Sequence, residues 1–385
     1  MVTGKLYYEN AHLRQFEARV LTCGKAEGGY EVTLSATAFY PEGGGQAGDT
    51  GSLGNVKVTD TRERGEEVVH LCDGPLEPGT LVTGTINWEP RFQRMQSHSG
   101  EHMVSGIIHS RYGWHNTGFH MGADCITIDF DGVVPQKDLP EIEAQVNGYV
   151  WQNLPIRCWY PDPEELARLP YRTKKQLPWP VRIVEIPGVD LCACCGTHVE
   201  ATGEIGLIKL LDAVNFRGGT RIQMACGAQA FAILNAAYGQ NKQVSQAFSA
   251  RMEETGAAAR KMNEILAAQK YQTVSIQRRL FSAIGEGCRG RKNPVCFEDN
   301  LDGAALGELA ETISAVSQGF AAVFTGNDQQ GYQYCIMSTS QDLRPLGKQM
   351  NQALAGRGGG KPNCQQGRVG AKRQEIERFF QFLEA

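Results

Sequence analysis

The chain contains the pentapeptide His98-Ser99-Gly100-Glu101-His102 within the segment 91–112, whose side chains repeat at helical spacing. In a helix, residues i and i+4 lie on one face with their Cβ atoms about 6 Å apart. His98 and His102 would then point the same way, which suits two imidazole ligands of one Zn²⁺ ion. The pair alone does not decide the matter, because histidines at this spacing also occur as core or surface residues.

A second motif further along the chain, at residues 192–198, reads Cys192-Ala193-Cys194-Cys195-Gly196-Thr197-His198. Its C-x₃-H element can supply a thiolate and a third imidazole, and we expect Gly196 to let the turn bring them to one centre. H-x₃-H followed by C-x₃-H predicts a site for one Zn²⁺ per chain. The predicted ligands are His98, His102, Cys194 and His198, with the fourth position left open between His198 and water.

The predicted metal site is compatible with more than one function. Three histidines and one cysteine, in a chain large enough to fold without a metal, favour a catalytic over a structural zinc. H-x-x-E-H is also a zinc peptidase pattern with Glu101 as general base, but such sites are completed by a carboxylate, and here the distal partner is Cys194. A glutamate at this position is more often a solvated helix residue. Cys195 adds a thiol that can compete for the metal or be oxidised.

Composition narrows the class of protein. The chain has 385 residues, 41% hydrophobic and 21% charged, which excludes a disordered or fibrous protein. Its 38 basic and 42 acidic residues give a net charge of −4, so any RNA contact must come from local patches. Residues 1–9 lack the apolar core of a secretory signal, and no apolar run approaches the roughly 18 residues that span a bilayer, so we expect neither a signal peptide nor a membrane span. With twelve mostly scattered cysteines, it is expected to be cytoplasmic and not membrane-bound.

The pattern of elements predicts an α+β multidomain protein. Its four expected parts are a small β-barrel at 1–90, an α+β zinc domain at 91–228, a long helix or helical hairpin at 229–284, acting as a linker or coiled coil, and a small α/β domain with a Gly-rich loop at 285–385. Within them we expect strands near 124–130, 181–186, 206–211, 321–325 and 334–337, and helices near 140–152 and 376–383.

One further anomaly is the stretch Thr37-Ala38-Phe39-Tyr40-Pro41-Glu42-Gly43-Gly44-Gly45-Gln46-Ala47-Gly48-Asp49-Thr50-Gly51. Three consecutive glycines behind aromatic residues do not form a strand or a flexible linker. They indicate close approach of the backbone to a ligand or to another loop.

This loop, the residues 98–102 and the residues 194–199, in that order, resemble the editing domain of alanyl-tRNA synthetase and more closely the free-standing alanyl-tRNA editing family, AlaX. Nothing resembles the aminoacylation domain of the synthetase. The stretch 356–363 resembles the Gly-rich motif of the synthetase's C-terminal, DHH-associated domain, which implies the long form of the family. Two departures leave the ligands in place: Cys195 stands where synthetases commonly have Gly, and Ala47 where Pro often follows Gln.

The resemblance implies an aminoacyl-tRNA deacylase that hydrolyses mischarged tRNA(Ala) in trans and without ATP. Its substrates would be Ser-tRNA(Ala) and also Gly-tRNA(Ala), because a pocket for alanine excludes similar side chains poorly. Thr37 would recognise the seryl hydroxyl, and Gln46 would orient the substrate or its terminal adenosine. His120 is a weaker site candidate and is more often a core histidine. The alternative is a non-catalytic tRNA-binding protein with a structural zinc.

The C-terminal region is locally basic. Residues 343–373 contain no Asp or Glu, and the basic residues among them are Arg344, Lys348, Arg357, Lys361, Arg368, Lys372 and Arg373. The phosphate-loop template fails, because Ala355 and Pro362 stand where it needs Gly and Ser or Thr. A basic, Gly-rich loop suits a phosphate backbone, which the resemblance implies is that of tRNA. The expected tRNA-binding residues are Arg357, Gly358, Gly359, Gly360, Lys361 and Arg368. A homodimer through the C-terminal region is a further expectation.

Overall fold

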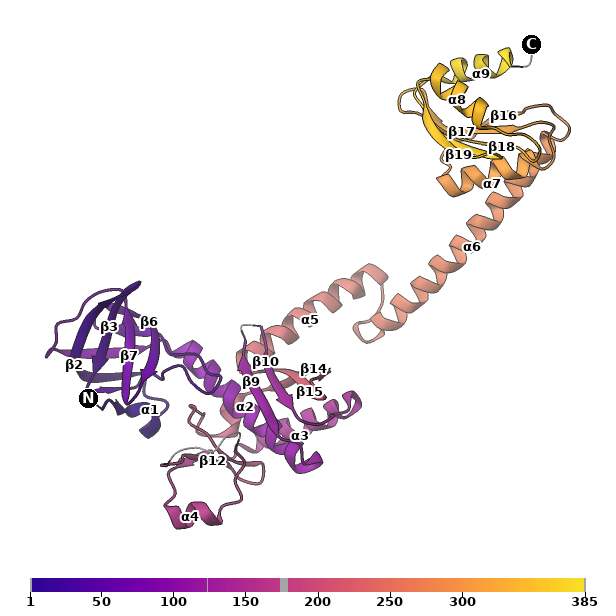
Figure 1. Cartoon of the computed structure of the whole chain (residues 1–385). Helices are drawn as coiled ribbons and strands as arrows, with labels where there is room; N and C mark the ends of the chain where they lie inside the picture. Colours follow the sequence, from indigo (N-terminus) through magenta and orange to yellow (C-terminus); the bar gives the residue numbers. More distant parts are fainter. Residues whose placement is uncertain (1, 123, 174–178, 384–385) are drawn as a thin grey trace. The chain divides into compact units, whose positions relative to one another are not determined.

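The computed structural model describes residues 2–122, 124–173 and 179–383, and the chain divides into two compact units, Met1–Gln243 and Val244–Ala385 (Figure 1). Both units combine helices with sheets, so the predicted α+β class is confirmed. Among the described residues, no helix is both long enough and apolar enough to cross a membrane. The finer division into four domains stays a prediction.

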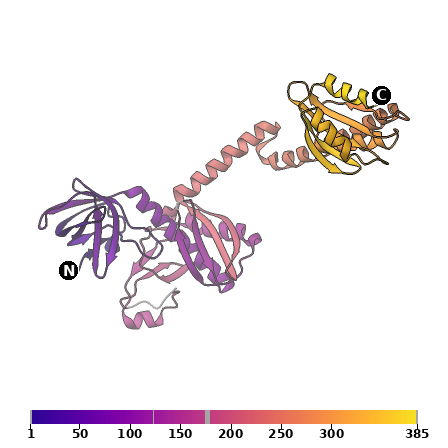
Figure 2. The ribbon, with the colours of Figure 1, turned by 45° about the horizontal axis from the view of Figure 1, so that its top comes forward.

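The first part of the chain forms a closed antiparallel barrel, drawn in indigo in Figure 1 and Figure 2. Its strands, in their order around the ring, are β2 (Gln15–Ala26), β3 (Gly29–Leu34), β7 (Glu67–Cys72), β6 (Val56–Arg64), β5 (Gly51–Leu53) and β8 (Leu81–Ile86). The flanking elements are α1 (Leu6–Glu9) and the parallel pair β1 (Gly4–Lys5) and β4 (Ala36–Thr37). From Phe16 to Val20, buried and exposed residues alternate, as they must where one face of a strand fills a barrel. The barrel predicted for this part of the chain is therefore present.

Helix α2 (Trp88–Tyr112) follows the barrel and contains the H-x₃-H motif. It ends at Gly113, whose φ of 77° provides a left-handed cap. Every residue from Met95 to Ile108 is buried, although half of them carry polar side chains. Because buried polar groups need hydrogen-bond partners, such a helix indicates a polar site inside the core.

Two sheets surround this helix. The antiparallel four-stranded sheet has the order β14 (Ile208–Phe216), β15 (Gly219–Cys226), β10 (Ile126–Phe130) and β9 (Asn116–Met121), and the three-stranded sheet has β11 (Arg157–Trp159), β12 (Ile183–Ile186) and β13 (Asp190–Ala193). The helical elements beside them are η1 (Gln136–Asp138), α3 (Leu139–Gln152), α4 (Pro163–Arg168) and η2 (Thr202–Ile205). The strands and the helix predicted for this region are confirmed, with ends shifted by a few residues.

Residues 227–287 form two helices, α5 (Gly227–Phe248) and α6 (Thr255–Gly287), separated by the short turn η3 (Met252–Glu254). A continuous helix is therefore wrong. The break starts at Ser249, which has a positive φ of 49° that a helix cannot continue through.

The second unit is built on a five-stranded sheet covered on both faces (Figure 1). The strand order is β16 (Val295–Phe297), β17 (Ala321–Asn327), β18 (Gly331–Met337), β20 (Cys364–Val369) and β19 (Arg357–Lys361). The helices are α7 (Gly303–Ser314), α8 (Arg344–Ala353) and α9 (Arg373–Phe382). One core cluster contains Met350 of α8 and Phe380 of α9, and the other joins Phe281 of α6 to Ile313 of α7.

The predicted Gly-rich loop near residue 358 is instead an edge strand, because Arg357–Lys361 pairs along its whole length with β20. The glycines make this pairing possible. A Cβ on Gly358 would lie 2.3 Å from the carbonyl oxygen of Gln366 and 2.3 Å from the hydroxyl of Tyr334. A run of glycines that resembles a loop in sequence is here the condition for close strand packing.

Candidate metal centre

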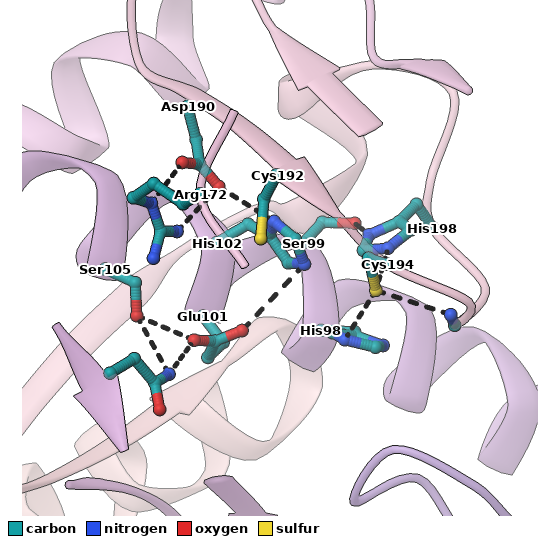
Figure 3. A network of polar contacts seen from close by, with 12 residues as sticks. His98, Ser99, Glu101, His102, Ser105, Arg172, Asp190, Cys192, Cys194 and His198 are labelled. Carbon is teal, nitrogen blue, oxygen red and sulfur yellow. Dashed lines mark hydrogen bonds and ion pairs between the residues drawn. The ribbon is translucent and has the colours of Figure 1, made fainter. Parts of the chain in front are cut away.

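The structure brings the four predicted metal ligands together (Figure 3). His98 and His102 come from α2, Cys194 directly follows β13, and His198 lies four residues further along an irregular segment. One donor atom from each residue lies within 4.8 Å of the other three. The Cys194 Sγ atom is 3.4 Å from the Nε2 atoms of both His98 and His198. These four side chains could therefore hold one metal ion, and their role as ligands stays a prediction.

The three imidazole rings are held by partners on their far side. The partners of the Nδ1 atoms are Gln46 Oε1 for His98 at 3.4 Å, Asp190 Oδ2 for His102 at 2.8 Å and Ser99 Oγ for His198 at 3.2 Å. Each ring therefore presents its Nε2 atom to the centre. Histidine ligands of metals are commonly oriented in this way by a second hydrogen bond, so the residues present fit a metal ion.

The surroundings of Cys194 lower the pKa of its thiol. Burial alone would raise its pKa, but the neighbouring charges of His98, His102 and His198 outweigh burial and hold that pKa well below its ordinary value. The backbone N–H of Gly196 also donates to the sulfur at 3.3 Å. Because the thiolate is the form that binds metal, the cluster suits a cation with mixed nitrogen and sulfur ligands.

In the turn after Cys194, steric contact with a neighbouring ring explains the glycine, and backbone flexibility does not. We expected Gly196 to let the turn bring Cys194 and His198 to one centre, and its φ is not positive, so a left-handed backbone is not the reason for the glycine. A Cβ on Gly196 would instead lie 2.1 Å from Cε1 of His98, so glycine is needed to make room for the ring. Arg182 fixes the same turn, donating from Nη1 to the carbonyl oxygens of Cys194 at 3.0 Å and Gly196 at 2.9 Å.

The loop that contains Gly43, Gly44 and Gly45 also lies next to the metal centre. A Cβ on Gly45 would lie 2.8 Å from the carbonyl oxygen of Phe119, and the Phe119 ring stacks on His98 with 5.3 Å between centroids. The backbone does approach another part of the chain closely, but that part is strand β9 and not the ligand or loop that we expected. Gln46 is buried and donates to Thr197 Oγ1 at 2.8 Å, so it supports His98 and is not among the described residues that line the cavity.

A cavity of about 300 Å³ opens beside the centre. The described residues that line it are Gly44, His98, Glu101, His102, Arg172, Thr173, Cys192, Ala193, Cys194, Cys195 and Gly196. Sequence reasoning missed Arg172 and Asp190, which form a bidentate ion pair at 2.7 and 2.8 Å. Asp190 in turn accepts the His102 Nδ1–H, so this pair connects the cavity wall to the centre. The only sequence signal was the position of Asp190 beside the cysteine motif.

Glu101 is not the solvated helix residue that we expected, because it is only 2% exposed and lines the cavity. Its Oε1 atom accepts hydrogen bonds from Ser105 Oγ at 2.6 Å and from Asn116 Nδ2. Its Oε2 atom lies 4.0 Å from Nε2 of His102 (Figure 3). A carboxylate therefore sits next to one of the metal-donor atoms.

Two predicted residues lie elsewhere. Thr37 is fully buried and is not among the described residues that line the cavity. Its Oγ1 donates to Nε2 of His70 at 2.9 Å and accepts the N–H of Phe39 at 3.1 Å, so this placement does not support contact with a seryl hydroxyl. His120 is exposed on β9, outside the cavity lining, and the expectation of a core histidine is also wrong. Cys195 is exposed and lines the cavity but is not one of the four donors.

The predicted tRNA-binding residues gather on two neighbouring strands of the second unit. Arg357, Gly358, Gly359, Gly360 and Lys361 are all exposed on β19. Arg368 lies opposite Arg357 on β20, and its guanidinium donates to the carbonyl oxygen of Gln330. The remaining basic residues are partly compensated, because Arg344 is paired with Asp342 at 2.6 Å and Arg373 with Glu377 at 2.9 Å.

Known proteins are similar to this chain over most of its length. Residues 181–223 match the family model described as threonyl and alanyl tRNA synthetase second additional domain. The chain is 29% identical to the alanyl-tRNA editing protein AlaX-L of Pyrococcus horikoshii, over 97% of this chain and 96% of that protein. It is 27% identical to the alanyl-tRNA editing protein Aarsd1-A of Xenopus laevis, over 92% and 88%. An alanine–tRNA ligase of Thermofilum pendens is 31% identical over 95% of this chain but only 42% of the ligase. Over nearly its whole length, the chain is therefore a relative of the alanyl-tRNA editing proteins AlaX-L and Aarsd1.

Proposed function

We propose that this chain is a trans-acting editing deacylase that hydrolyses the ester between serine, or glycine, and the terminal ribose of mischarged tRNA(Ala). The observation that carries the proposal is the convergence of His98, His102 and Cys194 on the wall of a cavity, in a chain related end to end to alanyl-tRNA editing proteins. A cavity of about 300 Å³ is at the lower end of small-ligand sites, a size that suits a small acyl group.

The metal in this proposal is Zn²⁺, which favours a mixed set of three nitrogens and one sulfur. When bound, zinc supplies a Lewis acid that can polarise a carbonyl oxygen or lower the pKa of water. His98, His102 and Cys194 would hold it on the cavity side. His198 is buried and is not among the described lining residues, so it would complete the site from behind.

The surrounding residues orient the ligands. Gln46 fixes the ring of His98, and Asp190, itself held by Arg172, fixes the ring of His102. These partners keep the Nε2 atoms directed at one point, so that the donor set is formed before a substrate arrives.

The domains divide the work in this proposal. Residues 1–90 and 91–228 would form the hydrolytic part, and residues 285–385 would bind tRNA through the basic strand β19 and Arg368. The helical segment 229–284 would link the two and provide the contact of a homodimer. We expect the protein to act in the cytoplasm, where aminoacyl-tRNA is used.

A non-catalytic tRNA-binding protein is the second candidate, and one observation favours it. Four protein donors within 4.8 Å of one another are typical of a closed, structural zinc site. The peptidase alternative is supported only by Glu101 beside His102. Incubation with Ser-, Gly- and Ala-tRNA(Ala) separates the candidates, because only the deacylase releases free amino acid.

Substitution of neighbouring thiols tests the role of the metal. We expect Cys194→Ser to lose both stoichiometric zinc and hydrolysis of Ser-tRNA(Ala), while Cys195→Ser keeps the zinc, because the Cys195 thiol is not among the four donors. Metal analysis, the deacylation rate and thermal unfolding are measured on both variants. Unfolding of the whole chain by Cys194→Ser would make the site structural and contradict the proposal.

A further inference from the structure

The cavity contains one carboxylate that the proposed reaction has not yet used. Among the described residues that line the cavity, Glu101 is the only acidic one. The other lining side chain with a permanent charge, Arg172, is bound to Asp190 through two nitrogens. Asp190 also accepts a hydrogen bond from His102, so both side chains of this ion pair already bind other groups of the protein.

The orientation of the Glu101 carboxylate is fixed. Its Oε1 atom accepts from Ser105 Oγ, in the next turn of the same helix, and from Asn116 of β9. These two donors come from two different elements and help to set the plane of the carboxylate. This arrangement directs Oε2 toward Nε2 of His102, 4.0 Å away, and thus toward the metal-donor cluster (Figure 3).

The substrate class offers a matching group. An aminoacyl ester differs from other ribose esters by an ammonium group on the carbon next to the carbonyl. A carboxylate that accepts a hydrogen bond from an ammonium forms one of the stronger polar contacts in proteins, and more so where water is excluded. With the ester carbonyl beside the donor cluster, the ammonium would lie within reach of a carboxylate only 4.0 Å from Nε2 of His102.

We propose that Glu101 binds the α-ammonium group of the aminoacyl ester, so that the site selects free aminoacyl esters over those whose amino group is blocked or replaced. This inference rests on the proposed deacylase function. It differs from the peptidase reading of H-x-x-E-H, in which Glu101 activates water. A water-activating carboxylate serves every ester equally, whereas an ammonium-binding carboxylate serves only esters that carry the ammonium.

The test pairs two enzymes with two substrates. The zinc-loaded full chain and its Glu101→Gln variant hydrolyse seryl-tRNA(Ala) and the isosteric α-hydroxy ester, in which a hydroxyl replaces the ammonium. We expect the substitution to lower kcat/KM for the seryl ester about tenfold or more and to change that for the α-hydroxy ester little. The ratio of the two effects removes the difference in intrinsic reactivity of the esters.

A binding experiment supplies a readout that does not depend on turnover. Titration with the 3′-amide analogue of seryl-adenosine, which is not an ester, should show weaker binding to Glu101→Gln and unchanged binding of its α-hydroxy counterpart. Glu89→Gln is the matched control, an exposed carboxylate on the same helix. Zinc content and unfolding temperature confirm that each variant is folded and loaded.

Each outcome decides a different claim. Equal loss of rate on both esters would assign Glu101 to water activation and overturn this inference, and so would no loss on either. No hydrolysis of any aminoacyl-tRNA by the unaltered, zinc-loaded chain would overturn the proposed function and this inference with it.

Discussion

At the scale of single residues, the metal centre depends on the absence of a side chain at Gly196. Gly196→Ala would put a methyl group 2.1 Å from Cε1 of His98, and the ring would have to leave the position in which Gln46 holds it. We expect loss of most bound zinc and of deacylation with little change in overall stability. Gly148→Ala on helix α3 is the control, because a Cβ there meets no atom within 4 Å. Full zinc occupancy in Gly196→Ala would contradict this account of the turn.

The hydroxyl of Thr37 has hydrogen-bond partners inside the barrel, and its predicted role in recognition can be tested by substitution. Nδ1 of His70 donates to the Val32 carbonyl oxygen, and burial lowers the His70 pKa to about 4, so the neutral ring accepts at Nε2 from the Thr37 hydroxyl. Thr37→Val leaves that nitrogen unsatisfied and should lower the free energy of unfolding by about 1–3 kcal/mol. Because Thr37 does not line the cavity, the ratio of seryl to glycyl hydrolysis should stay constant. A selective loss on seryl-tRNA would restore the role in recognition that the sequence suggested.

The site residues that could be predicted from the sequence differ physically from those that could not. Candidate ligands such as His98 and Cys194 could be picked out in the sequence, because residue type and spacing carry their chemistry. Partners such as Asp190 and Arg172 were not, because an Asp or Arg belongs to a site only once the fold brings it there. The same holds for Glu101, whose burial depends on what packs around α2 and not on its neighbours in the chain.

At the scale of elements, most strands and helices were predictable, since alternation and helical spacing are local properties. Strand β19 was not, because its pairing with β20 depends on contacts that a run of glycines does not display. The position of the break between α5 and α6 could not be located from the sequence. The chain has no proline there, and the break is marked only by the left-handed conformation of Ser249.

Strand β19 also offers a clean test of tRNA binding. A Cβ on Gly359 meets no atom within 4 Å, whereas one on Gly358 would clash with Tyr334 and Gln366. Gly359→Glu therefore adds a negative charge between Arg357 and Lys361 without a steric clash. We expect weaker tRNA binding and a smaller salt dependence, with Gly359→Ala as the neutral control, measured by titration at several salt concentrations. Unchanged affinity in Gly359→Glu would remove β19 from the RNA-binding surface.

At the scale of the whole molecule, the division into two units suggests where the chain can be cut. The start of α5 belongs to the first unit, because Gln93 of α2 donates to the carbonyl oxygen of Cys226 at 3.0 Å and accepts from the N–H of Gln229 at 3.3 Å, and because Ala230 is fully buried. A boundary after residue 228, which the sequence suggested, would expose this contact. The structure favours a cut after Gln243.

A chain of residues 1–243 should keep its zinc and its intrinsic hydrolysis, because every predicted ligand and the described cavity lining lie within it. It should bind tRNA less tightly, since the basic strand β19 and Arg368 are removed. Each lost phosphate contact should lower the log–log slope of affinity against salt by about 0.7–0.9. Hydrolysis of a seryl-adenosine ester should therefore be nearly unchanged, while kcat/KM for seryl-tRNA(Ala) falls. Equal tRNA affinity and an equal salt slope in both chains would assign the second unit to another task, such as dimerisation through α6, which sedimentation of the two chains would then detect.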